Sequence, residues 1–322
     1  MKMITLCVFV LFSWSLTETA LLAQSTTRSM TLEDVVMLKS VSDPQISPDG
    51  RRIVYVVGEA DLKESSTNAD LWLVESNGGT PLRLTTSKKS DNTPRWSPDG
   101  NMIAFLSARE EKTQIYLISP FGGEADKLSD LKSAPSSIEW SPDGKRIAFL
   151  AQNPPSEEEE KKKKEKNDAV IVDQEFKMSH LWVIDIGTRK AVRLTNADSL
   201  TISQPRWAPD GKRIAFVTNP TPKADDGSLS DLWIYSFADS TSRKLTNNSG
   251  PDTSPIWSPD GTTIAYLSRP GNLPMEVQSG KISQLITGDH VISSPTLSRD
   301  GKTVAMIHQD GTNPVDIAVA SG

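Results

Sequence analysis

One short segment occurs six times along the 322-residue chain, and it constrains the fold more than any other feature. The copies, in chain order, are PQISPDG (44–50), PRWSPDG (94–100), IEWSPDG (138–144), PRWAPDG (205–211), PIWSPDG (255–261) and PTLSRDG (295–301). Successive final glycines are 50, 44, 67, 50 and 40 residues apart. A repeat of this length indicates an array of similar structural units.

The last residues of each copy predict a tight turn between two antiparallel strands. Proline presets φ for a type I turn, aspartate suits the next position, and glycine takes the left-handed conformation that rejoins the strands. Arg299 replaces the proline in the sixth copy. The predicted turn residues are Asp49, Gly50, Asp99, Gly100, Asp143, Gly144, Asp210, Gly211, Asp260, Gly261, Asp300 and Gly301. A calcium ladder is the alternative, but each turn offers one carboxylate where calcium loops need several oxygen ligands.

Strand-like segments follow each turn in a fixed order. In the six copies the second strand has the sequences RRIVYVV, NMIAFLS, KRIAFLA, KRIAFVT, TTIAYLS and KTVAMIH. A third recurs as DLWLVES, QIYLISP, HLWVIDI and DLWIYSF, and a fourth ends in Leu-Thr or Leu-Ser. Four short strands per repeat predict an all-β fold, a β-propeller of about six four-stranded blades or an incomplete seven-bladed one.

Tryptophans recur at two positions of the repeat. Trp96, Trp140, Trp207 and Trp257 occupy the first position, and Trp72, Trp182 and Trp233 the second. Tryptophan is common in binding hot spots. Recurrence at fixed positions instead favours large rings packed between neighbouring blades.

Three departures break the repeat. Residues 152–178 lengthen the third copy with the charged run EEEEKKKKEK, which predicts a solvated loop or short helix. The fifth copy has a third strand that is short or missing, and the sixth lacks a fourth strand.

The N-terminus predicts export. Residues 1–23 have the order of a secretory signal peptide, with cleavage after Ala23 or, alternatively, Ala20; an uncleaved anchor is the other interpretation. Residues 24–43 form a lead-in with a helix capped at Thr31, and residues 44–322 the propeller. Cys7, the single cysteine, lies in the signal, so we expect a periplasmic or extracellular protein without disulfides.

No catalytic, metal or cofactor site can be assigned. The chain contains no G-x-S-x-G nucleophile elbow and no glycine-rich phosphate loop. None of the three histidines has a second histidine at ligand spacing, and we expect His180 at a surface position of its strand. The net charge of −6 argues against a nucleic-acid partner.

The WSPDG hairpin with its DLW and Leu-Thr strands resembles the propeller repeat of TolB and of the prolyl oligopeptidase family of serine peptidases. The run MTLEDVVMLKSVSDPQISPDGRRIVYVV is similar to the start of the dipeptidyl-peptidase and acylaminoacyl-peptidase branch. The segments HLWVIDIGTRKAVRLT and GDHVISSPTLSRDGKTVAMIHQDGTNPVDIAVA are similar to later parts of that propeller. In that family an α/β-hydrolase domain carrying the Ser-Asp-His triad follows, and no residue here matches a triad motif.

Two functions follow from the resemblance. The first is a non-catalytic propeller like the substrate-gating and peptide-binding domain of an exported peptidase, lacking its hydrolase domain. The alternative is a TolB-like exported scaffold that binds a protein partner. An enzyme activity carried by the propeller itself has no residue support, because a fold does not imply a function.

Overall fold

The structure is a computed structural model that describes residues 28–62, 65–166, 176–196, 198–247, 250–268, 273–276, 291–297, 303–309 and 316–321. The expected signal peptide, together with Asp300 and Gly301, lies outside these ranges. The chain divides into two compact units, residues 1–38 and 39–322. None of the described helices is long and apolar enough to cross a membrane.

The described part of the first unit contains the helix predicted in the lead-in. Helix α1 (Leu32–Val36) begins at Thr31, whose hydroxyl accepts a hydrogen bond from the Asp34 backbone N–H. The Asp34 carboxylate accepts the Thr31 N–H at 2.8 Å in return, which completes a capping box. Thr31 therefore caps the helix as predicted.

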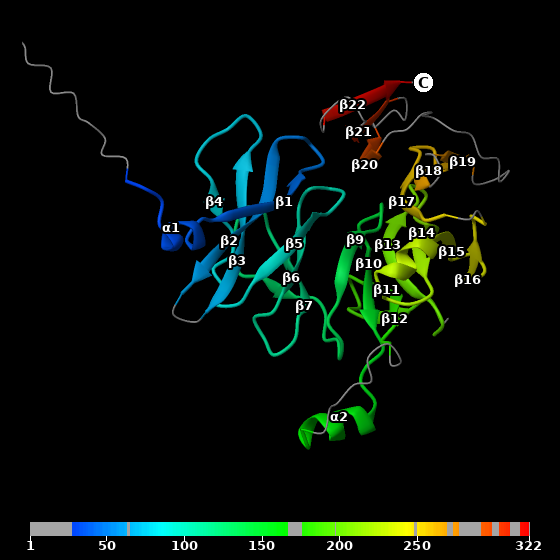
Figure 1. Cartoon of the computed structure of the whole chain (residues 1–322), viewed down its shortest axis with the longest axis horizontal. Coiled ribbons are helices and arrows are strands. Elements are labelled where there is room, and N and C mark those ends of the chain that lie inside the picture. The colour runs from blue at the N-terminus through cyan, green and yellow to red at the C-terminus, as the bar shows by residue number, and fades with distance from the viewer. Residues whose placement is uncertain are drawn as a thin grey trace, which may run out of the picture. The chain divides into compact units, whose positions relative to one another are not determined.

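The second unit consists of six antiparallel sheets, arranged in chain order (Figure 1). The first three contain β1 (Ser40–Ile46), β2 (Arg52–Asp61), β3 (Ser66–Glu75) and β4 (Leu82–Arg83); β5 (Asp91–Trp96), β6 (Ile103–Ser107), β7 (Gln114–Ile118) and β8 (Asp126–Lys127); and β9 (Ser136–Trp140), β10 (Arg146–Gln152), β11 (Ser179–Asp185) and β12 (Ala191–Arg193). The others contain β13 (Thr201–Trp207), β14 (Arg213–Asn219), β15 (Asp231–Ser236) and β16 (Thr241–Lys244); β17 (Asp252–Trp257), β18 (Thr263–Ser268) and β19 (Leu273–Glu276); and β20 (Val291–Leu297), β21 (Thr303–Gln309) and β22 (Asp316–Ser321).

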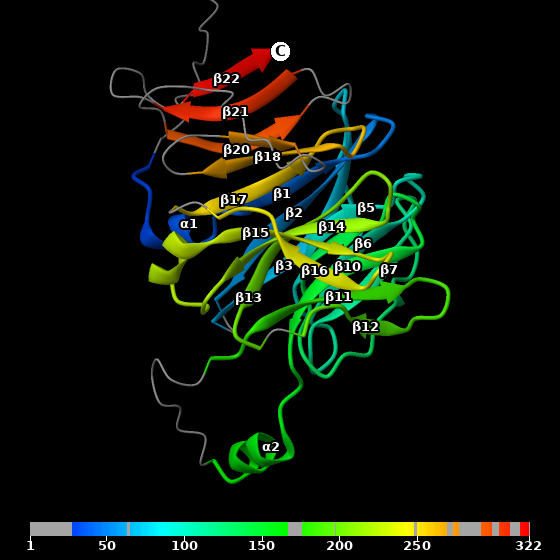
Figure 2. The ribbon, with the colours of Figure 1, turned by 90° about the vertical axis from the view of Figure 1, so that its right-hand side faces the viewer.

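Each sheet is a meander in which every strand pairs with the next (Figure 2). The four strands per repeat are confirmed in the first four sheets, and β1 begins at Ser40, inside the segment assigned to the lead-in. In the fifth sheet the third strand is present but has only four residues, Leu273–Glu276. The sixth sheet has three strands among the described residues, as the sequence indicates.

The repeated aspartates hold the turns. In four copies the carboxylate accepts a hydrogen bond from the serine two residues earlier and from the backbone N–H two residues later, for example from Ser141 Oγ at 2.6 Å and Lys145 N at 3.1 Å onto Asp143. In the fourth copy Ala208 replaces the serine, and Asp210 accepts hydrogen bonds from Lys212 N at 2.8 Å and from Arg213 Nη2 at 2.8 Å. The glycines of the five described turns have φ between 65° and 73°. These five copies have the carboxylate hydrogen bonds and the left-handed glycine that such a turn requires.

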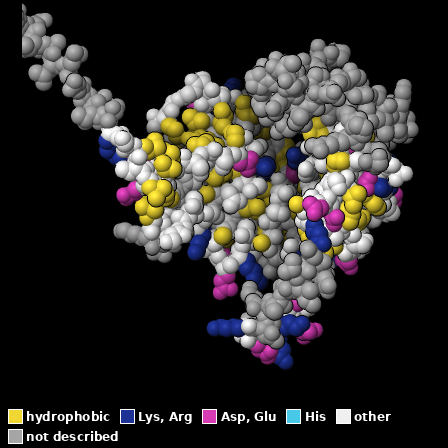
Figure 3. Space-filling view, in the orientation of Figure 1, with side chains coloured by type: hydrophobic (Ala, Val, Ile, Leu, Met, Phe, Trp, Pro, Cys, Tyr) yellow, Lys and Arg dark blue, Asp and Glu magenta, His cyan; other side chains and the backbone are white. Residues whose placement is uncertain are grey.

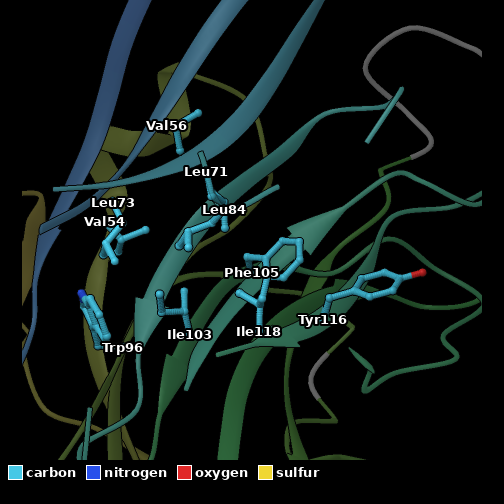
Figure 4. Close-up of a cluster of buried hydrophobic side chains, with 10 residues drawn as sticks. All are labelled: Val54, Val56, Leu71, Leu73, Leu84, Trp96, Ile103, Phe105, Tyr116 and Ile118. Carbon is cyan, nitrogen blue, oxygen red and sulfur yellow. The ribbon is translucent and has the colours of Figure 1, made fainter. Parts of the chain in front are cut away.

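The hydrophobic core lies between neighbouring sheets. The first cluster joins Val54, Val56, Leu71, Leu73 and Leu84 of the first repeat to Trp96, Ile103, Phe105, Tyr116 and Ile118 of the second (Figure 4). Similar clusters join the second repeat to the third, the third to the fourth, and the fourth to the fifth. Face-to-face packing of successive four-stranded sheets is the arrangement of propeller blades, and the fold is a β-propeller.

The first-position tryptophans bind each sheet to the one before it. Each indole Nε1 donates to a main-chain carbonyl in the first strand of the preceding sheet. The pairs are Trp96 to Gln45 at 3.0 Å, Trp140 to Arg95 at 3.0 Å, Trp207 to Glu139 at 3.2 Å and Trp257 to Arg206 at 3.1 Å. The predicted role between blades is confirmed for these four residues.

Arginines on the second strands cover the same indole rings. The guanidinium of Arg146 lies 4.9 Å from the ring centroid of Trp207 and 4.6 Å from that of Phe237 in the next repeat. Arg52 takes the same position over Trp96, and Arg213 over Trp257. Such cation–π contacts strengthen the junctions beyond the burial of apolar area. At the junction between the second and third sheets the position is occupied by Met102.

The charged insertion forms helix α2 (Glu157–Lys164), which projects away from the sheets (Figures 1 and 2). Its side chains are all Glu or Lys, so it has no apolar face. Glu158 and Lys162, four residues apart, pair at 3.0 Å. The short helix agrees with the sequence prediction.

Substitution of Trp207 by Phe tests the junction hydrogen bond. The ring remains in its cluster, but the bond to the Glu139 carbonyl is lost, and we expect the free energy of unfolding to fall by about 1 kcal/mol. Trp72→Phe is the matched control, because Trp72 is half-buried and its indole N–H has no partner among the described residues. Urea unfolding measures both. An equal loss in the two variants would contradict a specific role for the bond.

Candidate functional site

The first strand of each sheet contains a bulge that sets which side chains point to the inner part of the fold. The bulge residues have positive φ: Asp43 (46°), Thr93 (55°), Ser137 (50°), Gln204 (50°) and Ser254 (55°). All but Ser137 precede a proline, which has no N–H for the ladder. The pairing register shifts at each of these points. A bulge of this kind redirects the residues that follow it.

Two residues after each bulge lies a position that varies between repeats. It is occupied by Gln45, Arg95, Glu139, Arg206 and Ile256. None of these five residues was predicted from the sequence, because the repeat pattern indicates only the positions that are alike between copies. The signal that could have found them is the variable residue that stands immediately before the tryptophan in four copies and before Ile46 in the first.

A hollow of about 450 Å³ lies against the first strands of the first three sheets. It is lined by Gln45, Ile46, Ser47, Pro48, Arg95, Trp96, Pro98, Glu139 and Trp140. The lining therefore combines apolar and indole surface with one cation and one carboxyl group. Figure 3 shows acidic and basic side chains close together near the centre of the face it presents. Concave sites that are mostly apolar with a few polar groups are typical of ligand binding.

An ion pair crosses the first junction at this hollow. Arg95 Nη1 on β5 donates to both carboxylate oxygens of Asp43 on β1, at 2.9 and 2.8 Å. Gln45 Nε2 donates to the same carboxylate at 2.6 Å. Asp43 and Arg95 are each about 30% exposed, so water screens the pair less than it screens a surface pair.

A looser ion pair crosses the third junction. Glu139 Oε1 accepts the Trp207 backbone N–H at 3.1 Å, and Glu139 Oε2 lies 3.6 Å from Arg206 Nη1. Oε2 is shielded from water and has no hydrogen-bond partner among the described residues. Burial raises the pKa of Glu139 to about 7, against the opposing effects of Arg206, the Trp207 N–H and Arg95. This carboxyl group can therefore exchange a proton near neutral pH.

The predicted turn residues lie at the edge of this site rather than in it. Pro48 and Pro98, from the first two turns, line the hollow. A Cβ placed on Gly100 would lie 3.6 Å from Pro48 Cδ, and the later turns are in contact in the same way. The aspartates are occupied within their own turns. Among the residues that the structure describes, no three His, Cys, Asp or Glu side chains gather as a metal site.

His180 occupies a second, smaller cavity, and its expected surface position is wrong. Its side chain is 1% exposed. The equivalent residue of the first repeat, Asp70, pairs with Arg83 at 2.5 Å. In the third repeat Arg193 instead pairs with Asp198 at 2.8 Å, and the His180 ring nitrogens have no hydrogen-bond partner among the described residues. Burial lowers the pKa of His180, so the ring is neutral at pH 7.

Glu139→Gln tests the electrostatics of the hollow. A carboxyl group with a raised pKa makes the folded state bind more protons than the unfolded state, so it lowers stability as pH rises from about 4.5 to about 7. At about 1.4 kcal/mol per pKa unit, the wild-type protein should lose about 2 to 3 kcal/mol between pH 5 and pH 8 relative to the variant. Urea unfolding at the two pH values measures the difference. Parallel pH profiles would rule out a raised pKa.

Comparison with known proteins agrees with this architecture. A domain model described as "TolB beta propeller domain" matches residues 164–321, and the "Tricorn protease N-terminal beta propeller domain" matches residues 66–167. Peptidase YuxL of Bacillus subtilis is 38% identical over 81 residues, which are 25% of this chain and 12% of that protein. Dipeptidyl-peptidase 5 of Porphyromonas gingivalis is 32% identical over 83 residues, 26% of this chain and 12% of that protein.

A similar fold occurs in a solved peptidase. The acylaminoacyl peptidase of Pyrococcus horikoshii superposes with a TM-score of 0.64 at 18% identity, over 89% of this chain and 47% of that chain. This chain therefore corresponds to less than half of that peptidase and aligns with about an eighth of the two curated relatives. The chain is a β-propeller of the kind found in TolB and in the N-terminal part of serine peptidases of the prolyl oligopeptidase family.

Proposed function

We propose that this chain is the peptide-binding and substrate-gating propeller of an exported serine peptidase and carries no catalytic residue itself. The observation on which the proposal depends is the hollow at the inner strands, where apolar and indole surface surrounds Arg95 and Glu139. The relation to peptidases supports the substrate class. The order of residues 1–23 supports export.

The chemistry of the hollow suits a short peptide. Trp96, Trp140 and the two prolines offer apolar contact, while Arg95, Glu139 and Gln45 offer donors and acceptors for main-chain amides. Residues 1–322 contain no nucleophile elbow, so peptide bond cleavage would depend on groups outside this propeller. The propeller would then select and hold peptides.

A TolB-like scaffold that binds a folded protein is the second candidate. Its support is the TolB domain match over residues 164–321 and the exposed Val41, Leu82 and Val192 on the sheets. Exposed apolar side chains are common on monomers, however. The hollow is the more specific feature.

Binding of short peptides distinguishes the two candidates. We expect a library of acetylated, amidated tetrapeptides to contain ligands that change the indole fluorescence of residues 24–322, because Trp96 and Trp140 line the hollow. Arg95→Ala should weaken these ligands at least tenfold, since it removes the cation that lines the hollow. Arg189→Ala, at an exposed arginine paired with Asp126, is the matched control and should bind like the wild type.

Thermal unfolding of both variants separates lost binding from lost structure. Failure of every tetrapeptide to bind the folded wild-type protein would contradict the peptide-binding proposal. Equal affinities in Arg95→Ala and wild type would place the peptide elsewhere on the propeller.

A further inference from the structure

We propose that the hollow binds a peptide carboxylate together with one proton, which Glu139 holds against the ligand. This inference rests on the proposed function and adds to it the chemical class of the ligand and its coupling to pH. It combines three observations on the first strands: Arg95 donors that have no hydrogen-bond partner among the described residues, a Glu139 oxygen that has none and lies 3.6 Å from Arg206 Nη1, and the charge around both.

Two nitrogen atoms of Arg95 donate no hydrogen bond to any described residue. Its Nη1 makes both contacts to Asp43 and a further one to the Pro94 carbonyl at 2.6 Å. Its Nη2 and Nε have no partner among the described residues, although the side chain is only 31% exposed and lines the hollow. A planar guanidinium with two free donor groups matches the two oxygens of a carboxylate.

Glu139 completes the site only in its protonated form. The unpartnered Oε2 is a buried acceptor when ionised, whereas a protonated carboxyl group donates one hydrogen bond. Buried polar atoms rarely lack a partner in folded proteins. Because water does not reach Oε2 in this conformation, a ligand carboxylate would accept that proton only once the Glu139 side chain turns Oε2 toward the hollow that this residue lines.

The charges that face Glu139 favour this arrangement. The charged groups that act on Glu139 are Arg206 on β13 and Arg95 on β5, and Arg95 in turn pairs with Asp43 on β1; β9 itself contains no other charged side chain. With Glu139 ionised, the four charges sum to zero and a ligand carboxylate would add an unbalanced negative charge. With Glu139 neutral, these four residues together carry one positive charge, which the ligand carboxylate balances.

A cationic ligand is disfavoured by the same arrangement. Arg95 and Arg206 lie on the two neighbouring strands β5 and β13, and both lower the energy of an ionised Glu139 without any ligand. A third cation would add repulsion from both guanidinium groups. A neutral amide group would fit sterically but would leave the positive charge unbalanced. The lining therefore selects a carboxylate over its amide isostere.

The experiment compares two peptides that differ in one group. Ac-Ala-Asp-Ala-Ala-NH2 and its Asn counterpart are titrated into residues 24–322 by calorimetry at pH 6 and pH 8.5. At pH 6 we expect the Asp peptide to bind at least tenfold more tightly. Because Glu139 must take up a proton above its pKa, this preference should fall at least fivefold at pH 8.5, with proton uptake seen as a dependence of the heat on the buffer.

Glu139→Gln provides the decisive variant. Its amide donates a hydrogen bond at every pH, so the preference for the Asp peptide should be the same at pH 6 and pH 8.5. Glu75→Gln, at an exposed position at the end of β3, is the matched control and should keep the wild-type pH dependence.

Each outcome decides the proposal. A preference that falls with pH in the wild type and in Glu75→Gln, but not in Glu139→Gln, supports it. Equal binding of the two peptides, or a preference that Glu139→Gln leaves pH-dependent, overturns it while peptide binding stands. Absence of binding by both peptides and by the whole tetrapeptide library overturns this inference and the proposed function together.

Discussion

The hydrogen bond from each first-position indole to the first strand of the preceding sheet is the interaction on which the rest of the structure depends. It occurs at four successive junctions with N–O distances of 3.0 to 3.2 Å. A main-chain carbonyl on the first strand of the preceding sheet thereby gains a hydrogen bond, and the indole ring fills the space between the sheets. The arginine that covers the ring at three junctions adds a second contact between the same two sheets. The tryptophan at the first repeat position thus fixes both the packing of neighbouring sheets and their register.

The hollow is a consequence of this attachment. Because the carbonyls of Gln45, Arg95 and Glu139 are each held by a tryptophan of the next sheet, their strands cannot slide relative to one another. The side chains of the same three residues are free to differ between repeats, since the indole bonds use only the main chain. The main-chain contact is therefore the same at each junction, while the side chains at these positions can vary. This separation lets a repeat fold keep its architecture while its binding site changes.

The sequence predicted the fold in detail where the repeat is regular. The turns, the four-stranded sheets, the helix capped at Thr31 and the tryptophans between sheets follow from local chemistry that each copy repeats. The candidate site was missed because it depends on differences between copies and on contacts between residues 52 to 68 positions apart in the sequence. Nothing local indicates that Glu139 faces Arg206 or that Arg95 reaches Asp43. His180 was misplaced for a similar reason: the repeat showed that it replaces an aspartate, but not that the position is buried.

The central claim is that the inner strands, rather than the outer edges of the sheets, form the binding surface. Hydrogen exchange with and without a saturating tetrapeptide tests it most directly, because exchange reports protection strand by strand. We expect slower exchange at Asp91–Trp96 and Ser136–Trp140, with no change at the last strands Ala191–Arg193 and Thr241–Lys244. Protection confined to those outer strands, with unchanged exchange on β5 and β9, would contradict it.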